Sequence, residues 1–178
     1  MEELLKALSQ IGNLKDLPRA GWVREQVPHP ESVADHSFRA LMLALVLGPQ
    51  LGIDVGTVLR LLLVHDLAES DPTVGDITPF DGITEEEKHR RESSAMERLC
   101  AALPGGEEVL NLWREYNEGT SVEALIAKQL DALEMALQAT EYEQRYGKAL
   151  GGFLESARKK IRHPLLVQIL ERLGGPDE

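Results

Sequence analysis

The chain has 178 residues, of which 43% are hydrophobic and only 4% are aromatic. This length fits a single domain whose core is built mainly from Leu, Ala and Val, a composition that favours helices and excludes a largely disordered chain. The formal net charge of -11 argues against a nucleic-acid polymer as partner, because such binding depends on clustered Lys and Arg.

Three features of the sequence bear on the cellular compartment. Cys100 is the only cysteine, which rules out an intramolecular disulfide and fits a reducing environment. The N-terminal residues MEELLKALSQ are acidic where a secretory signal needs basic residues. The most apolar stretch, residues 40–47, is too short to span a bilayer. We therefore expect a cytoplasmic protein with no membrane partner.

The first half of the chain alternates helical patterns with one irregular stretch. Residues 2–11 predict a short amphipathic helix, and residues 12–30, with three prolines and two glycines, predict an irregular segment long enough to suspect a function. Residues 30–53 are apolar over most of the helical circumference, which predicts a helix buried on several sides. Residues 54–68 predict a second helix, with Asp54 as its N-cap.

The second half of the chain is also helical by pattern. Thr84 with Glu87, and Thr120 with Glu123, match the capping box that starts a helix. The predicted elements are a loop at 70–82, an exposed helix at about 84–103, a shorter helix carrying Trp113 and Tyr116, a long helix at about 120–146, and terminal helices at 151–161 and 164–173. No segment shows the alternation and hairpin turns of strands, so the chain is expected to be all-α.

Four polar residues interrupt these apolar helices: His36, His65, Asp66 and Asp131. Burying a carboxylate is costly unless it is paired or coordinated, so two carboxylates and two imidazoles on three helices predict a shared divalent cation. Taken singly, each residue has an ordinary explanation. His36 could be a core histidine bonded to a carbonyl, Asp66 a cap, and Asp131 a partner of Lys128 one turn earlier.

Several segments in a fixed order carry a family resemblance: PESVADHSFRA, VHDLAE, VGDITP and LDALEMALQATEYE. Together they resemble the HD-domain metal-dependent phosphohydrolases, and within these the 5′-deoxynucleotidase branch. The similarity runs from about Leu14 to Tyr146. It implies a single HD domain over residues 1–178, with a helical core at about 14–146 and a C-terminal helical extension at 151–173.

The resemblance also implies roles for individual residues. The implied metal ligands are His36, His65, Asp66 and Asp131. The implied catalytic carboxylates are those of Glu69 and Asp76, and the implied substrate contacts are made by Arg19, Gly21 and Trp22. A carboxylate beside a metal-bound water can orient that water or take its proton.

Each of the two catalytic assignments has an ordinary alternative. Glu69 follows His65 by four residues and is expected on the same helix face, but it could also be a solvated residue at a helix end. Asp76 could make an Asx turn in its loop. The loop between Glu69 and Asp76 is two residues longer than is usual in the family. Either the extra residues bulge outward, or Asp71 takes the place of Asp76.

One further departure concerns charge beside the site. Ala132 stands where relatives carry a lysine directly after the last metal aspartate, which removes a positive charge. The remaining histidines, His29, His89 and His163, are not assigned to the metal.

Trp22 and its neighbours allow two interpretations. The indole could plug the core from a loop, or it could pack against the sugar of a substrate and leave a 2′-hydroxyl without a partner. The second arrangement disfavours a ribonucleotide by about 1–3 kcal/mol. Arg19 and Arg24 could clamp the phosphate, because a guanidinium matches it bidentately, although one of them could be an ordinary surface charge.

The resulting hypothesis is hydrolysis of deoxyribonucleoside 5′-monophosphates to nucleoside and phosphate, with Co, Mn, Zn, Fe, Ni or Mg as the divalent ion. One alternative keeps the metal and changes the substrate to another small phosphate ester or a signalling nucleotide. The other is a metal- or nucleotide-binding module without turnover. A homodimer is also expected, because the helices near 107–118 and 152–173 carry Leu, Trp and Phe that could form an interface.

Overall fold

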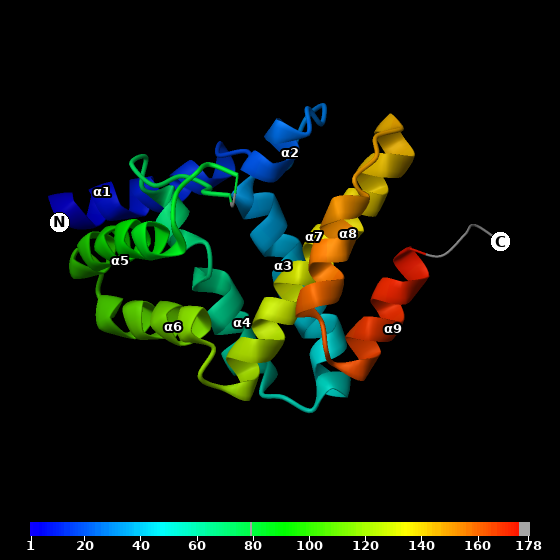
Figure 1. Ribbon diagram of the computed structural model, residues 1–178. Coiled ribbons are helices and arrows are strands. Elements are labelled where there is room, and N and C mark those ends of the chain that lie inside the picture. Colours follow the sequence, from blue (N-terminus) through cyan, green and yellow to red (C-terminus); the bar gives the residue numbers. More distant parts are fainter. Residues whose placement is uncertain (79, 175–178) are drawn as a thin grey trace.

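The computed structural model describes residues 1–78 and 80–174, and these residues form an all-helical fold (Figure 1). Within them there is no β-strand, and one isolated antiparallel bridge joins Pro18 to Ser32. The all-α prediction is confirmed. The α-helices are α1 (Glu2–Ile11), α2 (Ala20–Arg24), α3 (Val33–Leu51), α4 (Val55–Val64), α5 (Glu85–Ala101), α6 (Gly106–Glu118), α7 (Val122–Tyr146), α8 (Gly151–Lys160) and α9 (Pro164–Leu173). Two short 3₁₀ helices are η1 (Gly12–Lys15) and η2 (Leu67–Ser70).

The long helix α7 is the centre of the main core. It packs against α3, α4, α8 and α9, and Figure 1 shows α8 lying beside it. Leu130, Leu133 and Ala136 are fully buried along α7, as expected for an apolar stripe enclosed by neighbouring helices. A second cluster, with Met96 and Trp113 at its centre, joins α5 and α6 to α1 and η2. Because α7 lies between α3, α4 and α8, a side chain on its inner face can meet residues from all three.

The helix α3 begins with a complete capping box. The Ser32 hydroxyl accepts a hydrogen bond from the Asp35 backbone N–H at 3.1 Å, and the Asp35 carboxylate accepts one from the Ser32 N–H at 3.0 Å. The expectation that this helix is buried on several sides is wrong for one face. That face exposes four large apolar side chains, those of Phe38, Met42, Leu45 and Val46.

The predicted helix at 54–68 is shorter than expected. Asp54 is its N-cap, accepting from the Gly56 N–H at 2.9 Å, but α4 ends at Val64. The chain then tightens into η2, so Leu67–Ser70 is a 3₁₀ turn and not a continuation of the α-helix. The tighter turn is stabilised by burial, since all four of its residues are buried.

Two other expectations about elements need correction. Ser121, not Thr120, is the N-cap of α7, because its hydroxyl accepts the Ala124 N–H at 3.0 Å. The residues between 12 and 30 are also not wholly irregular, since they contain η1 and α2. Thr84 does cap α5, accepting from the Glu87 N–H at 3.2 Å, although one face of this helix is buried.

No helix in the described part of the chain combines the length and the apolar character needed to cross a membrane.

Candidate metal centre and substrate pocket

Three of the four predicted metal ligands, His36, His65 and Asp131, bring one ligand atom each to within 4.8 Å of one another, and Asp66 lies beside the two imidazoles. Nε2 of His36 lies 3.3 Å from Nε2 of His65 and 3.2 Å from Oδ1 of Asp131. Oδ2 of Asp66 lies 3.1 Å from Nε2 of His65 and 3.8 Å from Nε2 of His36. Ligand atoms around a tetrahedral ion bound at about 2.1 Å are about 3.4 Å apart, so the spacing of His36, His65 and Asp131 fits a divalent metal, with Asp66 adjacent to them.

Three helices supply this cluster. His36 lies in the first turn of α3, Asp131 lies in the middle of α7, and His65 with Asp66 follows the last turn of α4. Asp131 does not pair with Lys128, whose ammonium donates instead to the Asn117 carbonyl at 2.8 Å. The ordinary explanation considered for Asp131 is therefore wrong.

Further contacts orient the ligands. The ring Nδ1 of His65 lies 2.6 Å from the Leu62 carbonyl oxygen, which can only accept, so Nδ1 carries the proton and Nε2 faces the cluster. The Tyr116 hydroxyl donates to Oδ2 of Asp131 at 3.1 Å. On the other side of the cluster, Nδ1 of His36 contacts the carboxylate of Glu134.

Opposite charges in the cluster shift the pKa of its members. Burial and the nearby Arg19 lower the pKa of His36, but hydrogen bonds to Asp131 and Glu134 outweigh them and raise it to about 10. Burial would raise the pKa of Asp66, yet the neighbouring imidazoles and Arg19 hold it well below its usual range. The carboxylates of the cluster are therefore ionised and available to a cation at neutral pH.

Glu69 lies beside this cluster with an unsatisfied oxygen. Its side chain is buried, and Oε2 is the one buried side-chain nitrogen or oxygen without a hydrogen-bond partner within residues 1–78 and 80–174. Burial, and then the charges of Asp66 and Asp76, raise the pKa of Glu69 well above its ordinary value. The expectation of a solvated helix end is wrong, and the residue is placed by the 3₁₀ turn of η2, not by an α-helical face shared with His65.

The extra residues of the following loop turn away from the pocket. Asp71 accepts hydrogen bonds from the Thr73 N–H at 2.9 Å and from Arg98 of α5 at 2.7 Å. Asp76 lines the pocket, and its Oδ2 accepts from the Ala20 N–H at 2.7 Å. The geometry thus places Asp76, and not Asp71, beside the predicted ligands.

The predicted substrate-contact segment reaches the same place. Nη1 of Arg19 lies 3.1 Å from Oδ2 of Asp66, in a largely buried ion pair. Trp22 lines the pocket but is only 2% exposed, since its ring packs against Phe153 with centroids 4.2 Å apart and its Nε1–H donates to Glu31 at 2.9 Å. The indole is therefore chiefly a core residue with one edge at the pocket.

Gly21 and Arg24 complete this segment. A Cβ added at Gly21 would lie 3.2 Å from Phe153, so the glycine lets α8 approach α2 closely. Arg24 lies over the ring of Phe80, 3.6 Å from its centroid, and also contacts Glu25, which places it at the outer rim of the pocket.

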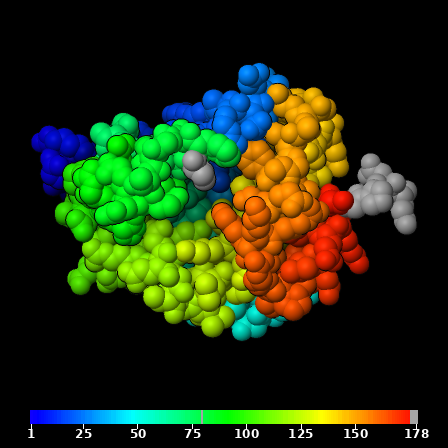
Figure 2. All heavy atoms as spheres, viewed as in Figure 1, coloured from blue at the N-terminus to red at the C-terminus, as the bar shows by residue number. Residues whose placement is uncertain are grey.

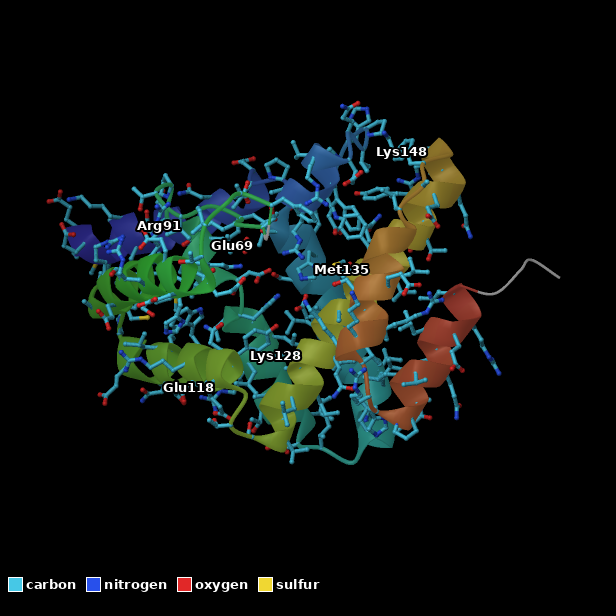
Figure 3. The ribbon with its side chains drawn as sticks, in the orientation of Figure 1. Glu69, Arg91, Glu118, Lys128, Met135 and Lys148 are labelled. Atoms are coloured by element: carbon cyan, nitrogen blue, oxygen red, sulfur yellow. The ribbon has the colours of Figure 1, made fainter. Side chains whose placement is uncertain are left out.

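The pocket has a volume of about 670 Å³ and extends from the cluster to α8. Figure 2 shows the surface hollowed between the green segment that contains α5 and the orange α8. In Figure 3, Glu69 lies on one side of this space and Met135 of α7 on the other. Its lining includes the polar side chains of Arg19, Asp66, Glu69, Asp76 and Asp131, together with Met135, Leu150, Phe153, Ser156 and Lys160.

Three residues of this arrangement were not predicted from the sequence. Glu134 could have been found, because it is a second acidic group in the apolar stretch that also contains Asp131. Tyr116 and Phe153 carry no such signal, since an aromatic residue on a helix is ordinarily a core residue.

A helical fold that gathers His, His-Asp and Asp side chains from three helices defines a class of metal-dependent proteins, the HD domain. A family model described as HD domain matches residues 11–171, and the chain belongs to this family. The match extends through α8 and most of α9. The family resemblance inferred from the sequence motifs is confirmed, and the family implies a divalent metal at this site.

Particular relatives agree with this assignment. The chain is 44% identical to human 5'-deoxynucleotidase HDDC2 over 174 residues, covering 96% of this chain and 84% of the relative. It is 42% identical to the zebrafish (Danio rerio) 5'-deoxynucleotidase HDDC2 over 178 residues, covering 98% and 88%.

Two solved structures share the fold. A conserved hypothetical protein from Pyrococcus furiosus superposes with a TM-score of 0.78 at 32% identity, covering 95% of this chain and 98% of that one. A predicted metal-dependent phosphohydrolase from Magnetospirillum magnetotacticum MS-1 has a TM-score of 0.69 at 25% identity, covering 97% and 93%.

Proposed function

We propose that this protein is a 5′-deoxynucleotidase that hydrolyses deoxyribonucleoside 5′-monophosphates to nucleoside and phosphate. The observation that carries the proposal is that His36, His65, Asp66 and Asp131 lie close together beside a pocket. The lining of this pocket also includes the carboxyl group of Glu69 and the guanidinium of Arg19. The names of the relatives support the same reaction.

We propose that His36, His65, Asp66 and Asp131 hold the divalent ion. When bound, this ion supplies Lewis-acid chemistry that makes water more acidic and polarises the phosphate. We propose that Arg19 binds the phosphate oxygens, because its guanidinium lines the pocket beside Asp66.

The reaction breaks the bond between phosphorus and O5′, adds the oxygen of water to phosphorus, and delivers a proton to O5′. We propose that Glu69 and Asp76 carry out the proton transfers, by orienting the attacking water or by protonating the leaving oxygen. Glu69 suits this role because its Oε2 has no protein partner and its raised pKa lets it hold a proton.

The preference for a deoxyribose is assigned to the segment around Trp22. Since the indole face is covered by Phe153, only the ring edge can approach a sugar, and the proposed role of Trp22 includes holding α2 in place. A wall without a partner for the 2′-hydroxyl disfavours a ribonucleotide.

The direct test is phosphate release from matched deoxyribo- and ribonucleoside 5′-monophosphates, with Co, Mn, Zn, Fe, Ni or Mg added to metal-free protein. We expect turnover of the deoxy compounds and its loss in Asp131→Asn. No deoxynucleotide turnover with any metal would refute the proposal. Turnover of a different phosphate ester in the same assay would identify the alternative hydrolase.

We further propose that residues 1–178 form one HD domain, and that the protein is cytoplasmic and homodimeric. The helices predicted for the interface are α6, α8 and α9, but neither the Trp nor the Phe among them is free for a contact, because Trp113 is buried and Phe153 packs on Trp22. The exposed apolar face of α3 that includes Phe38 and Met42 is a better candidate for the dimer contact. Light scattering at micromolar concentration tests this, and a wild-type monomer would discard it.

A further inference from the structure

A fully buried carboxylate lies on the side of His36 that faces away from the pocket. Glu134 is on α7, three residues after Asp131, and its side chain has no exposed surface. Its Oε2 contacts Nδ1 of His36, and its Oε1 accepts a hydrogen bond from Nε of Arg39 at 2.8 Å. Both oxygens of Glu134 are therefore occupied by protein donors.

Arg39 is itself held in one position. Its Nη2 donates to the Gln138 side chain at 2.6 Å, and its Nη1 donates to both carboxylate oxygens of Glu141 at 2.8 Å. The guanidinium compensates the buried charge of Glu134, which would otherwise be strongly unfavourable. The result is a chain of contacts from the surface, through Arg39 and Glu134, to His36.

This cluster does not have the properties of a second metal site. Glu31, His36 and Glu134 do bring three possible ligand atoms close together. However, the Trp22 Nε1–H occupies Oε1 of Glu31, and both oxygens of Glu134 are already bonded. The guanidinium of Arg39 would in addition repel a cation from Glu134.

We propose that Glu134 is a positioning residue for the metal site. By accepting the Nδ1 proton of His36, it keeps that proton on Nδ1 and leaves Nε2, which faces Asp131 and His65, as the nitrogen that binds the metal. The inference rests on the proposed metal ligation by His36. Outer contacts of this kind typically contribute about 10- to 100-fold to metal affinity.

The variant Glu134→Gln separates this role from simple packing, because it keeps the size of the side chain. A glutamine between Arg39 and His36 must point its NH₂ group at one of them. If the NH₂ group faces Arg39, two hydrogen-bond donors lie opposite each other with no acceptor between them. If the NH₂ group faces His36, Nδ1 must accept its hydrogen bond, so the ring proton lies on Nε2. A proton on Nε2 blocks metal binding.

The experiment is a titration of metal-free protein with Co²⁺, followed by visible absorption, for wild type, Glu134→Gln and Glu141→Gln. Glu141 is the matched control, since it contacts the same arginine without touching His36. We expect Glu134→Gln to bind Co²⁺ about 10- to 100-fold more weakly, with an altered spectrum, and Glu141→Gln to stay within about twofold of wild type. Wild-type affinity in Glu134→Gln would overturn the inference, even if its thermal stability were lower.

A measurement on the wild type keeps the inference testable if the variant does not fold. In Zn²⁺-loaded protein, ¹⁵N-resolved NMR of the histidine rings should show the His36 proton on Nδ1. A proton on Nε2 would overturn the inference. Metal binding with the expected tautomer but without nucleotide turnover would support it while refuting the proposed reaction, so the two failures can be told apart.

Discussion

At the scale of single residues, burial has different consequences for the acidic side chains of the site. Asp66 and Asp131 lie against two imidazoles, which favour the charged form. Glu69 is also buried, but near other carboxylates, so its neutral form is favoured instead. The carboxylates of Asp66 and Asp131 are therefore suited to binding a cation, and the carboxyl group of Glu69 is suited to proton transfer. The difference between their pKa values arises from their surroundings alone.

The variant Glu69→Gln should lower kcat by about 100-fold or more, because an amide cannot exchange a proton with water or with the leaving oxygen. Steady-state kinetics with a deoxynucleotide monitor this, while Co²⁺ affinity should change little. Glu92→Gln is the control, since Glu92 is a largely buried acid that pairs with Lys88 and does not line the pocket. Unchanged kcat in Glu69→Gln would favour a binding module or a different proton donor.

At the scale of elements, short capping contacts set where the functional helices begin and end. The hydroxyl of Ser121 accepts the Ala124 N–H and donates to the Glu115 side chain, which ties the start of α7 to the end of α6. The loop that carries Asp76 is held in a similar way, by the bonds of Asp71 to Thr73 and to Arg98. Both contacts lie outside the pocket and place residues that line it.

Replacing Ser121 with Ala should lower the free energy of unfolding by about 1 kcal/mol, because one N–H of the first turn of α7 loses its acceptor. For a chain of this length the melting temperature should fall by about 2–4 °C. Thr120→Ala is the matched control and should leave it nearly unchanged, since Thr120 makes no cap. If a thermal melt showed a larger loss of stability in Thr120→Ala than in Ser121→Ala, the cap would be assigned to the wrong residue.

Asp71→Asn should lower the melting temperature at neutral pH and matter less in acid. Although burial raises the pKa of Asp71, bonds from Thr73 and Arg98 outweigh it and lower the pKa below its ordinary value. The stability from these bonds is therefore present above a pH of about 4 and is lost as the pH falls through the lowered pKa. Melting curves of both proteins from pH 7 down to 3 should converge, and a constant difference would contradict this.

At the scale of the whole molecule, the C-terminal helix α8 forms one wall of the pocket and supports the N-terminal segment of the site. Phe153 of α8 packs on Trp22 and Gly21 of α2, the helix that follows Arg19 and begins with the Ala20 N–H bonded to Asp76. The last third of the chain thus supports the first polar contacts of the pocket. The family match, which extends to residue 171, includes α8.

Phe153→Ala should reduce kcat/KM by about tenfold, because α2 loses the ring that holds Arg19 in place. It should also lower stability by about 2 kcal/mol, as expected for a partly buried aromatic ring. Leu165→Ala on α9 is the control for stability alone, since Leu165 packs on the core and does not line the pocket. If both variants had the same kcat/KM, the proposed support of α2 by α8 would be wrong.

Helical periodicity was sufficient to predict from the sequence the all-α fold and most element positions, and the cost of buried charge singled out the four side chains that the structure brings close together. These signals are local, because an apolar stripe and a polar residue within it can be recognised without knowing what they face.

The tertiary structure decided what depends on partners distant in the sequence. Only packing shows that Glu134 bonds to His36, that Trp22 is covered by Phe153, and that one face of α3 stays exposed. The 3₁₀ turn that places Glu69 belongs with these features, since all four of its residues are buried and Leu67 and Ala68 pack in the cluster around Met96 and Trp113.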